Sequence, residues 1–553
     1  MRFPLAIGDY SNQNRQQGCT MPISRRDFLS NSVAAGALLG MPLPAYAQAG
    51  GAKTLRVAVY TDMVGYDPII TTSNIAAYHG ALIYDMLFGN DENQVPHPQM
   101  VGDYHVSDDK LTWTMTLRDG LAFSDGSPVT TADVIPSIRR WQARASQNGK
   151  LLAATTEELV AVDDKTFQFK LKEPFPMLPA MLGSPATPLC FIMRKREAEM
   201  DPSKSIDAYI GSGPFVLNQG ETRPGIDYVY DRNPNYVPRD DAPNGLAGGK
   251  KALLDRVVLV NMPDAQTAIA ALQAGEIDFY EIPPIDFLPV LSADPNITVA
   301  DVMKSGTEGS IIINWLQPPF DNVKARQALL YAIDQKAILT GLFGDPNWFT
   351  PHPGWFTYGS ALYNEANSDW FRDAPDPEKS KQLLAEAGYD GKPVVILQAT
   401  DRKVNADAVT IIAQQMRAAG FNVQIDAIDW ATLLQRRPNK GPVGDGGWNL
   451  FASTFNGFIS SNPYTFGHMA TIGEKGWFGW PSDARNEELR AAWMKAETPE
   501  EQKKIAEQIQ ENAWNVVPRV SYGHWVQPVA YRSDLSGFVS IPGVLGFWNV
   551  KRG

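Results

Sequence analysis

The sequence predicts an α/β protein in which two α/β lobes are accompanied by an early β-rich insertion. Two observations predict this fold class. The later chain repeats a strand-helix-strand pattern, at 256–282 and again at 393–428, whereas residues 90–200 contain short alternating strands and one helix. Strand-helix-strand units of this length form right-handed crossovers between parallel strands, so we expect the two lobes to contain mainly parallel sheet.

Length and composition indicate a folded protein that does not bind nucleic acid. The chain has 553 residues, enough for two or three domains, and 44% of them are hydrophobic. Its formal net charge is −12 and it has no basic cluster, which makes nucleic acid and anionic membrane surfaces poor partners. We therefore expect a soluble globular protein, and we expect it to be a monomer.

The N-terminus predicts export through the Tat pathway. The stretch "SRRDFLSNSVAAGALLGMPLPAYAQAG" (24–50) has twin arginines, then an apolar run, then the small-x-small pattern of a cleavage site at Ala45-Tyr46-Ala47. The apolar run is about 13 residues long, too short to span a bilayer. Residues 1–47 are thus predicted to be a Tat signal peptide, with Met21 as an alternative start, and the mature protein is predicted to lie in the periplasm.

The first strands and the helix between them follow from local patterns. "TLRVAVY" (54–60) predicts a buried strand, and "LTWTMTL" (111–117) and "TFQFKL" (166–171) alternate as half-buried strands do. "ADVIPSIRRWQAR" predicts a helix with Thr131 as its N-cap, and Pro136 is expected to kink or loosen that helix.

The later helices have clear stop signals. "DAQTAIAALQAG" and "NADAVTIIAQQMRAAG" predict helices that end at Gly275 and Gly420. "DNVKARQALLYAIDQKAILTGLFG" (321–344) is amphipathic at helical spacing, with Asp321 as the predicted N-cap.

The usual signatures of catalysis and of metal binding are missing from the sequence. It contains no G-x-S-x-G, no H-E-x-x-H and no phosphate-binding P-loop. No two of the six histidines have the spacing of a zinc motif; these are His79, His97, His105, His352, His468 and His524. The sequence therefore predicts no catalytic residue, no metal site and no cofactor.

Several ordered motifs carry a family resemblance over essentially the whole mature chain. They are "LRDGLAFSDGSPVTTADVIPSIRRW" (117–141), "IGSGPFVL" (210–217), "RNPNYV" (232–237), "NWLQPPFDNVKARQALLYAIDQKAI" (314–338), "KSKQLLAEAGY" (379–389) and "FWNVKR" (547–552). Together they resemble the family 5 extracellular solute-binding proteins, the peptide/nickel-type receptors of ABC importers.

This resemblance implies a three-lobed, hinged periplasmic binding protein of type II-like architecture. Lobe I would combine 48–88, 208–305 and 520–553, lobe II would be the inserted 89–207, and lobe III would be 306–519. Crossings near 305 and 519 would form the hinge, with Gly306 and Gly309 available to absorb changes in backbone dihedrals. A small organic solute, peptide-like, opine-like or saccharide, would be captured between lobes I and III by hinge closure and delivered to the membrane permease subunits of an ABC importer.

The stretch "GGWNLFASTFNGFISSNPYTFGHMATIG" (446–473) departs from the family pattern. Peptide-binding members carry an Asp here that pairs with the α-ammonium of the peptide, but this stretch has no charged residue and places Phe458 or Ile459 at the comparable position. Burying an ammonium without a counter-charge is costly, so sugars or other non-zwitterionic compounds are expected to bind better than ordinary oligopeptides, unless Asp67 or Glu308 substitutes. The alternative interpretation is that the stretch is core.

The predicted ligand contacts combine aromatic faces with polar side chains that form hydrogen bonds. They are Tyr66, Asp67, Glu308, Trp355, Phe455, Asn456, Phe458, Ser460 and His468. Three rival functions remain open at this point: a receptor for a nickel or other metal chelate with His468 as a ligand, a receptor that serves a sensor, and an exported hydrolase.

Overall fold

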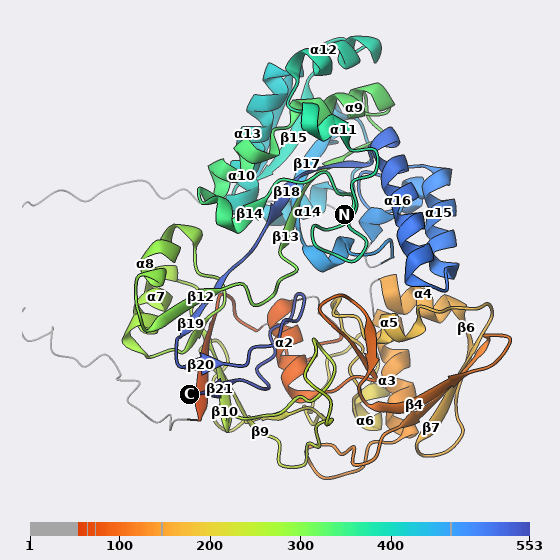
Figure 1. Cartoon of the computed structure of the whole chain (residues 1–553), viewed down its shortest axis with the longest axis vertical. Coiled ribbons are helices and arrows are strands. Elements are labelled where there is room, and N and C mark those ends of the chain that lie inside the picture. Colours follow the sequence, from red (N-terminus) through yellow and green to blue (C-terminus); the bar gives the residue numbers. More distant parts are fainter. Residues whose placement is uncertain (1–52, 64, 72, 145–146, 465–466) are drawn as a thin grey trace, which may run out of the picture. The chain divides into compact units, whose positions relative to one another are not determined.

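The structure is a computed structural model that describes residues 53–63, 65–71, 73–144, 147–464 and 467–553 (Figure 1). The predicted signal peptide lies outside these residues. The described strands form three larger sheets of seven, six and four strands, and two small two-stranded sheets. The mixed α/β fold class is therefore confirmed.

The seven-stranded sheet collects strands from both ends of the described chain, in the order β12-β19-β11-β1-β10-β9-β8. Its strands are β1 (Thr54–Val59), β8 (Phe215–Leu217), β9 (Asp227–Arg232), β10 (Arg256–Asn261), β11 (Phe279–Tyr280), β12 (Ile297–Ala300) and β19 (Val529–Arg532). Helices α2 (Asn74–Ile83), α7 (Ala265–Ala274) and α8 (Leu288–Ser292) pack against it. Helix α7 begins after the N-cap Asp264. It ends at Gly275, as predicted, and this glycine has the left-handed conformation.

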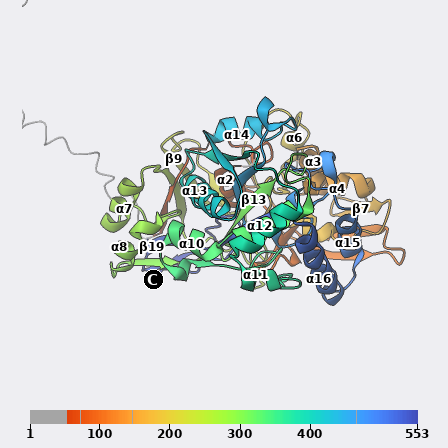
Figure 2. The same cartoon turned by 90° about the horizontal axis from the view of Figure 1, so that it is seen from above.

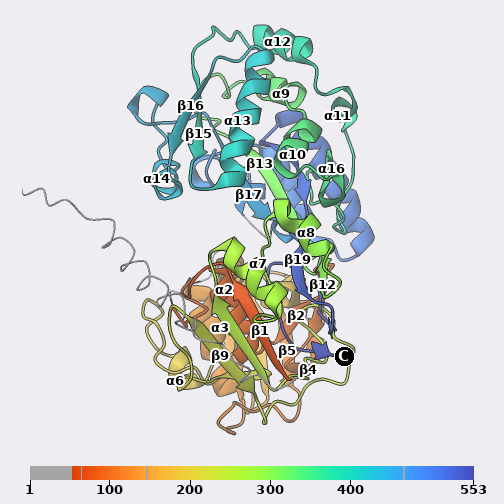
Figure 3. The same cartoon turned by 90° about the vertical axis from the view of Figure 1, so that its left-hand side faces the viewer.

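The six-stranded sheet has the order β14-β18-β13-β17-β15-β16. Its strands are β13 (Thr307–Ile313), β14 (Phe349–Thr350), β15 (Val394–Ala399), β16 (Val423–Ile428), β17 (Leu450–Asn456) and β18 (Arg519–Trp525). Helix α13 (Lys403–Ala418) lies along this sheet and contacts β15, β16 and β17 (Figure 3). Helices α15 (Ala484–Lys495) and α16 (Pro499–Val516) pack side by side (Figure 2).

The expectation of mainly parallel sheet is wrong. Parallel pairing occurs where β1 meets β10 and β11, and where β15 meets β16 and β17, whereas the other pairs in these two sheets are antiparallel. The local strand-helix-strand pattern predicted the parallel pairs. It carried no information on β18 and β19, which return from the far end of the chain and insert as antiparallel neighbours.

The β-rich insertion forms the four-stranded antiparallel sheet β4-β5-β7-β6. Its elements are β4 (Val101–Val106), β5 (Thr112–Leu117), β6 (Thr156–Ala161), β7 (Thr166–Leu171), α3 (Thr131–Arg144) and α4 (Gln147–Thr155). The predicted alternation is confirmed, since Trp113, Met115 and Leu117 are buried. Thr131 is not the side-chain cap of α3, because its hydroxyl donates to the carbonyl of Asp163. Helix α3 continues without interruption past Pro136, so the proline does not break the helix.

The stretch 321–344 forms two helices instead of the single predicted one. Helix α9 (Val323–Ala332) begins after Asn322, whose side chain accepts from the Lys324 N–H, so Asn322 is the cap and not Asp321. Helix α10 (Gln335–Phe343) begins after Asp334, whose side chain accepts from the Ala337 N–H. A second aspartate inside the apolar pattern was thus a helix start that the periodicity concealed.

The remaining helices and strands lie outside the three larger sheets and the helices named above. They are β2 (Phe88–Asn90), β3 (Pro96–Pro98), α5 (Leu178–Leu182), α6 (Lys195–Ala198), α11 (Asp369–Asp373), α12 (Pro377–Glu386), α14 (Trp430–Arg436), β20 (Leu535–Ser536) and β21 (Lys551–Arg552).

The chain passes between the seven-stranded and six-stranded sheets twice. It leaves through residues 301–306, between β12 and β13, and returns through 526–528, between β18 and β19. Gly306 has a φ of +56°, and a Cβ there would lie 2.3 Å from the ring of His524. The three larger sheets draw their strands from the same parts of the chain as the three predicted lobes, with one exception: β18 lies in the six-stranded sheet, although its residues 520–525 were predicted to belong to lobe I. The second crossing therefore follows β18, at 526–528, and not near 519 as predicted, and the lobe boundaries themselves stay a prediction.

The segment Gly211-Ser212-Gly213-Pro214 passes close to the backbone of another segment. A Cβ on Gly211 would lie 1.8 Å from the carbonyl oxygen of Ile83, and the Gly213 N–H donates to that same oxygen at 2.9 Å. Only glycine fits this approach between α2 and the segment before β8.

The substitution Gly211→Ala is expected to lower the free energy of unfolding by about 3 kcal/mol or more, because the clash is with backbone that cannot rotate away. Urea denaturation followed by circular dichroism measures the change. Gly444→Ala is the matched control, since Gly444 is exposed and a Cβ there meets no atom within 4 Å. Equal stability of the two variants would contradict the packing argument.

Candidate ligand-binding site

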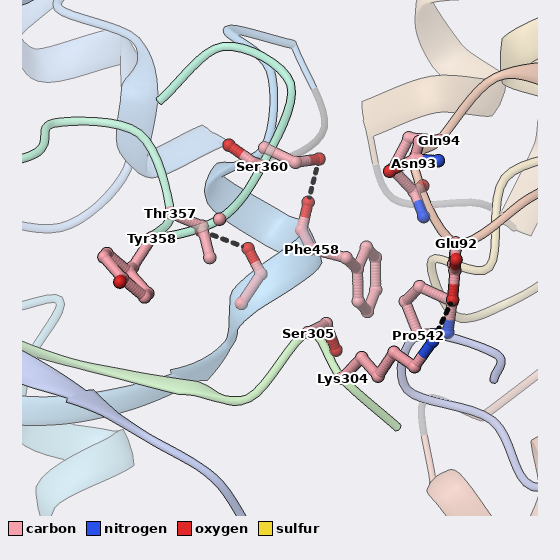
Figure 4. A pocket seen from close by; sticks show the side chains of 13 residues that line it. Glu92, Asn93, Gln94, Lys304, Ser305, Thr357, Tyr358, Ser360, Phe458 and Pro542 are labelled. Atoms are coloured by element: carbon pink, nitrogen blue, oxygen red, sulfur yellow. Dashed lines mark hydrogen bonds and ion pairs between the residues drawn. The ribbon is translucent and has the colours of Figure 1, made fainter. Parts of the chain in front are cut away.

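A cavity of about 180 Å³ lies beside the first crossing between the two sheets (Figure 4). Four parts of the chain line it: the turn between β2 and β3, the crossing itself, the loop after β14, and the turn after β17, with a single residue from the C-terminal segment. The lining residues are Glu92, Asn93, Gln94, Lys304, Ser305, Thr357, Tyr358, Gly359, Ser360, Gly457, Phe458, Ser461 and Pro542. Segments far apart in sequence thus meet where a small solute fits.

The turn after β17 presents an aromatic ring to this cavity. Asn456 Oδ1 accepts from the Phe458 N–H at 3.2 Å and from the Ser305 hydroxyl at 3.0 Å, which ties the turn to the crossing. A Cβ on Gly457 would lie 1.8 Å from the Ser305 carbonyl oxygen, so this position requires glycine. Phe458 projects toward Glu92, Asn93 and Gln94 on the opposite side (Figure 4).

The uncharged stretch 446–473 therefore serves both of the purposes considered for it. Its first half is core, because β17 is a central strand in which Leu450 and Phe451 are fully buried. Its second half, at Gly457, Phe458 and Ser461, lines the cavity. The glycine- and serine-rich composition after Asn456 was the sequence signal that separated the two halves.

His468 lies inside the protein beside two other predicted site residues. Its ring stacks on Phe455, with ring centroids 4.8 Å apart, and its Nε2 is 2.9 Å from the Ser460 hydroxyl. Burial, with the nearby Arg519, holds the pKa of His468 well below its ordinary value, so the ring is neutral at physiological pH. The structure brings these three residues together, but none of them is among the residues that line the cavity.

Glu308 is buried behind the cavity wall and is held by two histidines. Its Oε2 lies 3.0 Å from Nε2 of His352, and its Oε1 lies 3.0 Å from Nδ1 of His524. The Tyr358 N–H also points to Oε1, at 3.3 Å, and Tyr358 lines the cavity. Nδ1 of His352 accepts from the Gly354 N–H, so the proton of that ring is on Nε2 and is donated to Glu308.

The histidines determine the protonation of this carboxylate. Burial alone raises the pKa of Glu308, but the electrostatic interaction with His352 and the hydrogen bonds from both rings outweigh burial and hold the pKa well below its ordinary 4.5. Glu308 is therefore a buried anion whose two oxygens are already engaged. It does not reach the cavity as a partner for a ligand ammonium.

Asp67 is also fully engaged inside the protein. Its Oδ2 lies 2.7 Å from Nη2 of Arg140, and both side chains are completely buried. Its two oxygens also accept from the N–H groups of Ile69 and Ile206. The neighbouring Tyr66 packs against Tyr209, with ring centroids 5.0 Å apart. The structure thus uses Asp67 to hold segments of the chain together.

Trp355 belongs to the core of the six-stranded half. Its ring is 1% exposed, packs edge-on against Trp514, and lies under the guanidinium of Arg519 at 4.4 Å. Burial lowers the pKa of Arg519 to about 10, yet the group stays charged at neutral pH and forms a cation–π contact with the indole.

Although the stretch 446–473 has no carboxylate, the cavity has one, because Glu92 lines it opposite Phe458. Glu92 forms an ion pair with Lys304, whose Nζ lies 3.0 Å from Oε2. No local pattern marked either residue: one lies on a tight turn and the other on a crossing segment. Only the long-range topology places them together.

A second, larger groove of about 870 Å³ lies between the four-stranded sheet and the turn joining α15 to α16. It is lined by apolar side chains such as Trp113 and Phe175, and Lys110 pairs with Glu497 across it. None of the predicted site residues borders this groove, so it is not the candidate site.

The family is established by comparison. A model described as "Bacterial extracellular solute-binding proteins, family 5 Middle" matches residues 95–476. A probable peptide ABC transporter periplasmic-binding protein, y4tO of Sinorhizobium fredii, is 43% identical over 537 residues, covering 96% of this chain and all of that protein. The chain belongs to family 5 of the bacterial extracellular solute-binding proteins. This membership confirms the predicted resemblance, and the family and relative indicate the periplasm, as predicted.

Solved structures agree on the fold. A putative peptide-binding protein AppA from Clostridium difficile has a TM-score of 0.75 at 17% identity, with 90% of this chain and 100% of that chain covered. The binding protein AgaA of A. tumefaciens R10, solved with agropinic acid, has a TM-score of 0.72 at 22% identity, with 90% and 99% covered. The fold of these periplasmic binding proteins is thus the fold of this chain.

Within residues 53–553, apart from the few undescribed positions, no group of three or more His, Cys, Asp or Glu side chains is arranged to hold a metal ion. None of the helices in the same ranges combines the length and apolar character needed to cross a membrane.

The substitution Glu308→Gln is expected to lower the free energy of unfolding at pH 7 by about 3 kcal/mol, because it removes the buried anion between two imidazoles. The pKa of Glu308 is lower in the folded than in the unfolded protein. Its contribution is therefore complete above the ordinary 4.5 and is lost as the pH falls below that value.

Chemical denaturation at pH 7, 5 and 4 measures this effect, and the difference between parent and variant is expected to shrink at pH 4. Glu158→Gln is the control, since Glu158 is half-exposed in a surface pair with Lys170. A destabilisation that stayed constant down to pH 4 would mean that a packing defect, and not the lost charge, causes it.

Proposed function

We propose that this protein is the receptor of an ABC importer, that it captures a peptide-like or opine-like solute in the cavity beside Phe458, and that it delivers the solute to membrane permease subunits. The cavity carries this proposal: it lies at the crossing between the two sheets, and distant segments supply its walls. The y4tO relative, named as a probable peptide ABC transporter protein, supports the transport role.

Capture works by hinge closure around the two crossings. Residues 301–306 and 526–528 are short, and Gly306 already has a left-handed backbone conformation that tolerates dihedral change. The ligand stabilises the closed form by its differential affinity for that form, and nothing else drives closure. In this proposal the three lobes, with the predicted boundaries, move as units relative to one another. The receptor acts as a monomer.

A peptide-like or opine-like ligand replaces the earlier preference for sugars. That preference assumed that the ligand's ammonium would find no counter-charge, but Glu92 brings a carboxylate to the cavity. Free peptides carry a cationic nitrogen together with a carboxylate, and so do those opines whose nitrogen is an amine. Phe458 supplies an apolar face, and the hydroxyl groups of Tyr358 and Ser360 supply hydrogen-bond partners for such solutes.

Two rivals have no observation in their favour. The chelate receptor needed His468 at the ligand, but this ring is buried and its Nε2 is engaged by Ser460. The hydrolase needed a nucleophile with its base, and no histidine described above is presented to the cavity. Mass spectrometry of each bound compound after incubation tests turnover directly.

A thermal-shift screen of the mature protein against dipeptides, opine-type conjugates, oligosaccharides and nickel chelates tests the proposed ligand class. A ligand at about 1,000 times its dissociation constant adds roughly 4 kcal/mol to the free energy of unfolding, which is readily measured. We expect stabilisation by dipeptides or opine-type conjugates. Stabilisation by oligosaccharides or nickel chelates alone would refute the class.

The substitution Asn93→Trp tests the position of the site. Asn93 is exposed on the turn that lines the cavity, so an indole there fills the cavity without disturbing the core. Titration calorimetry is expected to show a loss of affinity of at least about tenfold for every compound that binds the parent. Asn347→Trp is the control, since Asn347 is equally exposed outside the cavity. Unchanged binding by Asn93→Trp would place the ligand elsewhere.

A further inference from the structure

The cavity contains one positive and one negative side chain, and the two are paired with each other. Among its lining residues only Glu92 and Lys304 carry a charge, and Lys304 Nζ lies 3.0 Å from Glu92 Oε2. The facing wall, from Thr357 to Ser360 and from Gly457 to Ser461, contributes hydroxyls and the aromatic rings of Tyr358 and Phe458 but no charge (Figure 4). Any charged group of a ligand in this cavity therefore meets this pair.

The ion pair is accessible to solvent and easily opened. The side chains of Lys304 and Glu92 are 62% and 40% exposed, so water screens their attraction and their net contribution to stability is small. A ligand that offers each of them a new partner within a closed cleft replaces a weak interaction with two stronger ones, because water is then excluded.

The backbones that carry the two charges are fixed independently of the ion pair. Asp91 Oδ1 accepts from the N–H groups of Asn93 and Val95, at 2.8 and 2.9 Å, and this bonding shapes the turn that presents Glu92. Asp301 Oδ1 accepts from the Lys304 N–H at 2.9 Å and shapes the turn of the crossing. The two side chains therefore swing apart while their Cα positions stay in place.

We propose that Glu92 and Lys304 together recognise a zwitterionic solute, with Glu92 binding its ammonium group and Lys304 binding its carboxylate. The inference rests on the proposed function and specifies the ligand class at the same site. It places the counter-charge for the ammonium on the turn between β2 and β3, opposite the uncharged 457–461 turn. The ion pair in the ligand-free protein keeps both charges compensated until the solute arrives.

Matched ligands and matched variants test this assignment by titration calorimetry. The probes are alanyl-phenylalanine, its N-acetyl derivative and its C-terminal amide. The variants are Glu92→Gln and Lys304→Met, each close in size to the parent side chain. Glu158→Gln is the control, because the Glu158–Lys170 pair has a similar exposure and a length of 2.7 Å but lies on the four-stranded sheet.

The expected result is a selective loss. Glu92→Gln should weaken binding of the free dipeptide at least about tenfold and leave the affinity for its N-acetyl derivative unchanged. Lys304→Met should weaken binding of the free dipeptide likewise and leave the affinity for the amide unchanged. Glu158→Gln should change none of the affinities, and all variants should keep the thermal midpoint of the parent because both pairs are exposed.

Other outcomes overturn the inference in distinguishable ways. An equal loss for free and capped probes would mean that the pair serves closure in general, and no loss would mean that the ligand does not touch it; the proposed function stands in both cases. Parent protein that binds none of the three probes and no opine-type conjugate would refute the proposed ligand class and this inference together.

Discussion

The antiparallel pairing of β13 with β18 is the constraint on which the rest of the molecule depends. These strands adjoin the two segments that link the seven-stranded to the six-stranded sheet, and they pair from Thr307 opposite Trp525 onward. Glu308 on β13 lies opposite His524 on β18, and its carboxylate contacts the rings of both His524 and His352. A buried anion with imidazole partners on both sides fixes the register here. If either strand shifted along the other, the carboxylate would lose its hydrogen-bond partners while it stayed buried.

That arrangement explains why the cavity lies where it does. Tyr358 donates its backbone N–H to Glu308, so the loop that forms one wall is positioned by the same carboxylate that holds the crossing strands. Ser305, on the crossing, donates to Asn456 and positions the turn that carries Phe458. The crossings and the walls of the cavity are thereby linked by a few hydrogen bonds, and the proposed capture by hinge closure requires such a link.

Sequence patterns predicted the local structure well and the long-range placement of charges poorly. Alternation predicted β5 and β7, and the glycine stop at Gly275 predicted the end of α7. The glycine- and serine-rich composition after Asn456 marks the boundary between the buried part of 446–473 and its cavity-lining part. The parallel bias, however, failed at β18 and β19, because strand pairing between distant segments depends on topology that periodicity does not record.

The carboxylates show most clearly that sequence patterns do not reveal which charged side chains meet in the folded protein. Asp67 and Glu308 were predicted to contact the ligand, yet each is buried and paired with a side chain distant in sequence, Arg140 for Asp67 and His524 for Glu308. Glu92 lies on an ordinary turn and was not predicted to contact the ligand, yet its side chain remains accessible in the cavity.

The difference follows from the cost of burying charge. A carboxylate that the fold must bury needs fixed donors, and those donors leave no oxygen for a ligand. A carboxylate held at the surface by a single screened lysine can exchange its partner at little cost. In this chain a charged group suited to recognise a solute is therefore expected among the exposed residues of turns and crossings, whereas the buried charges hold segments of the fold together.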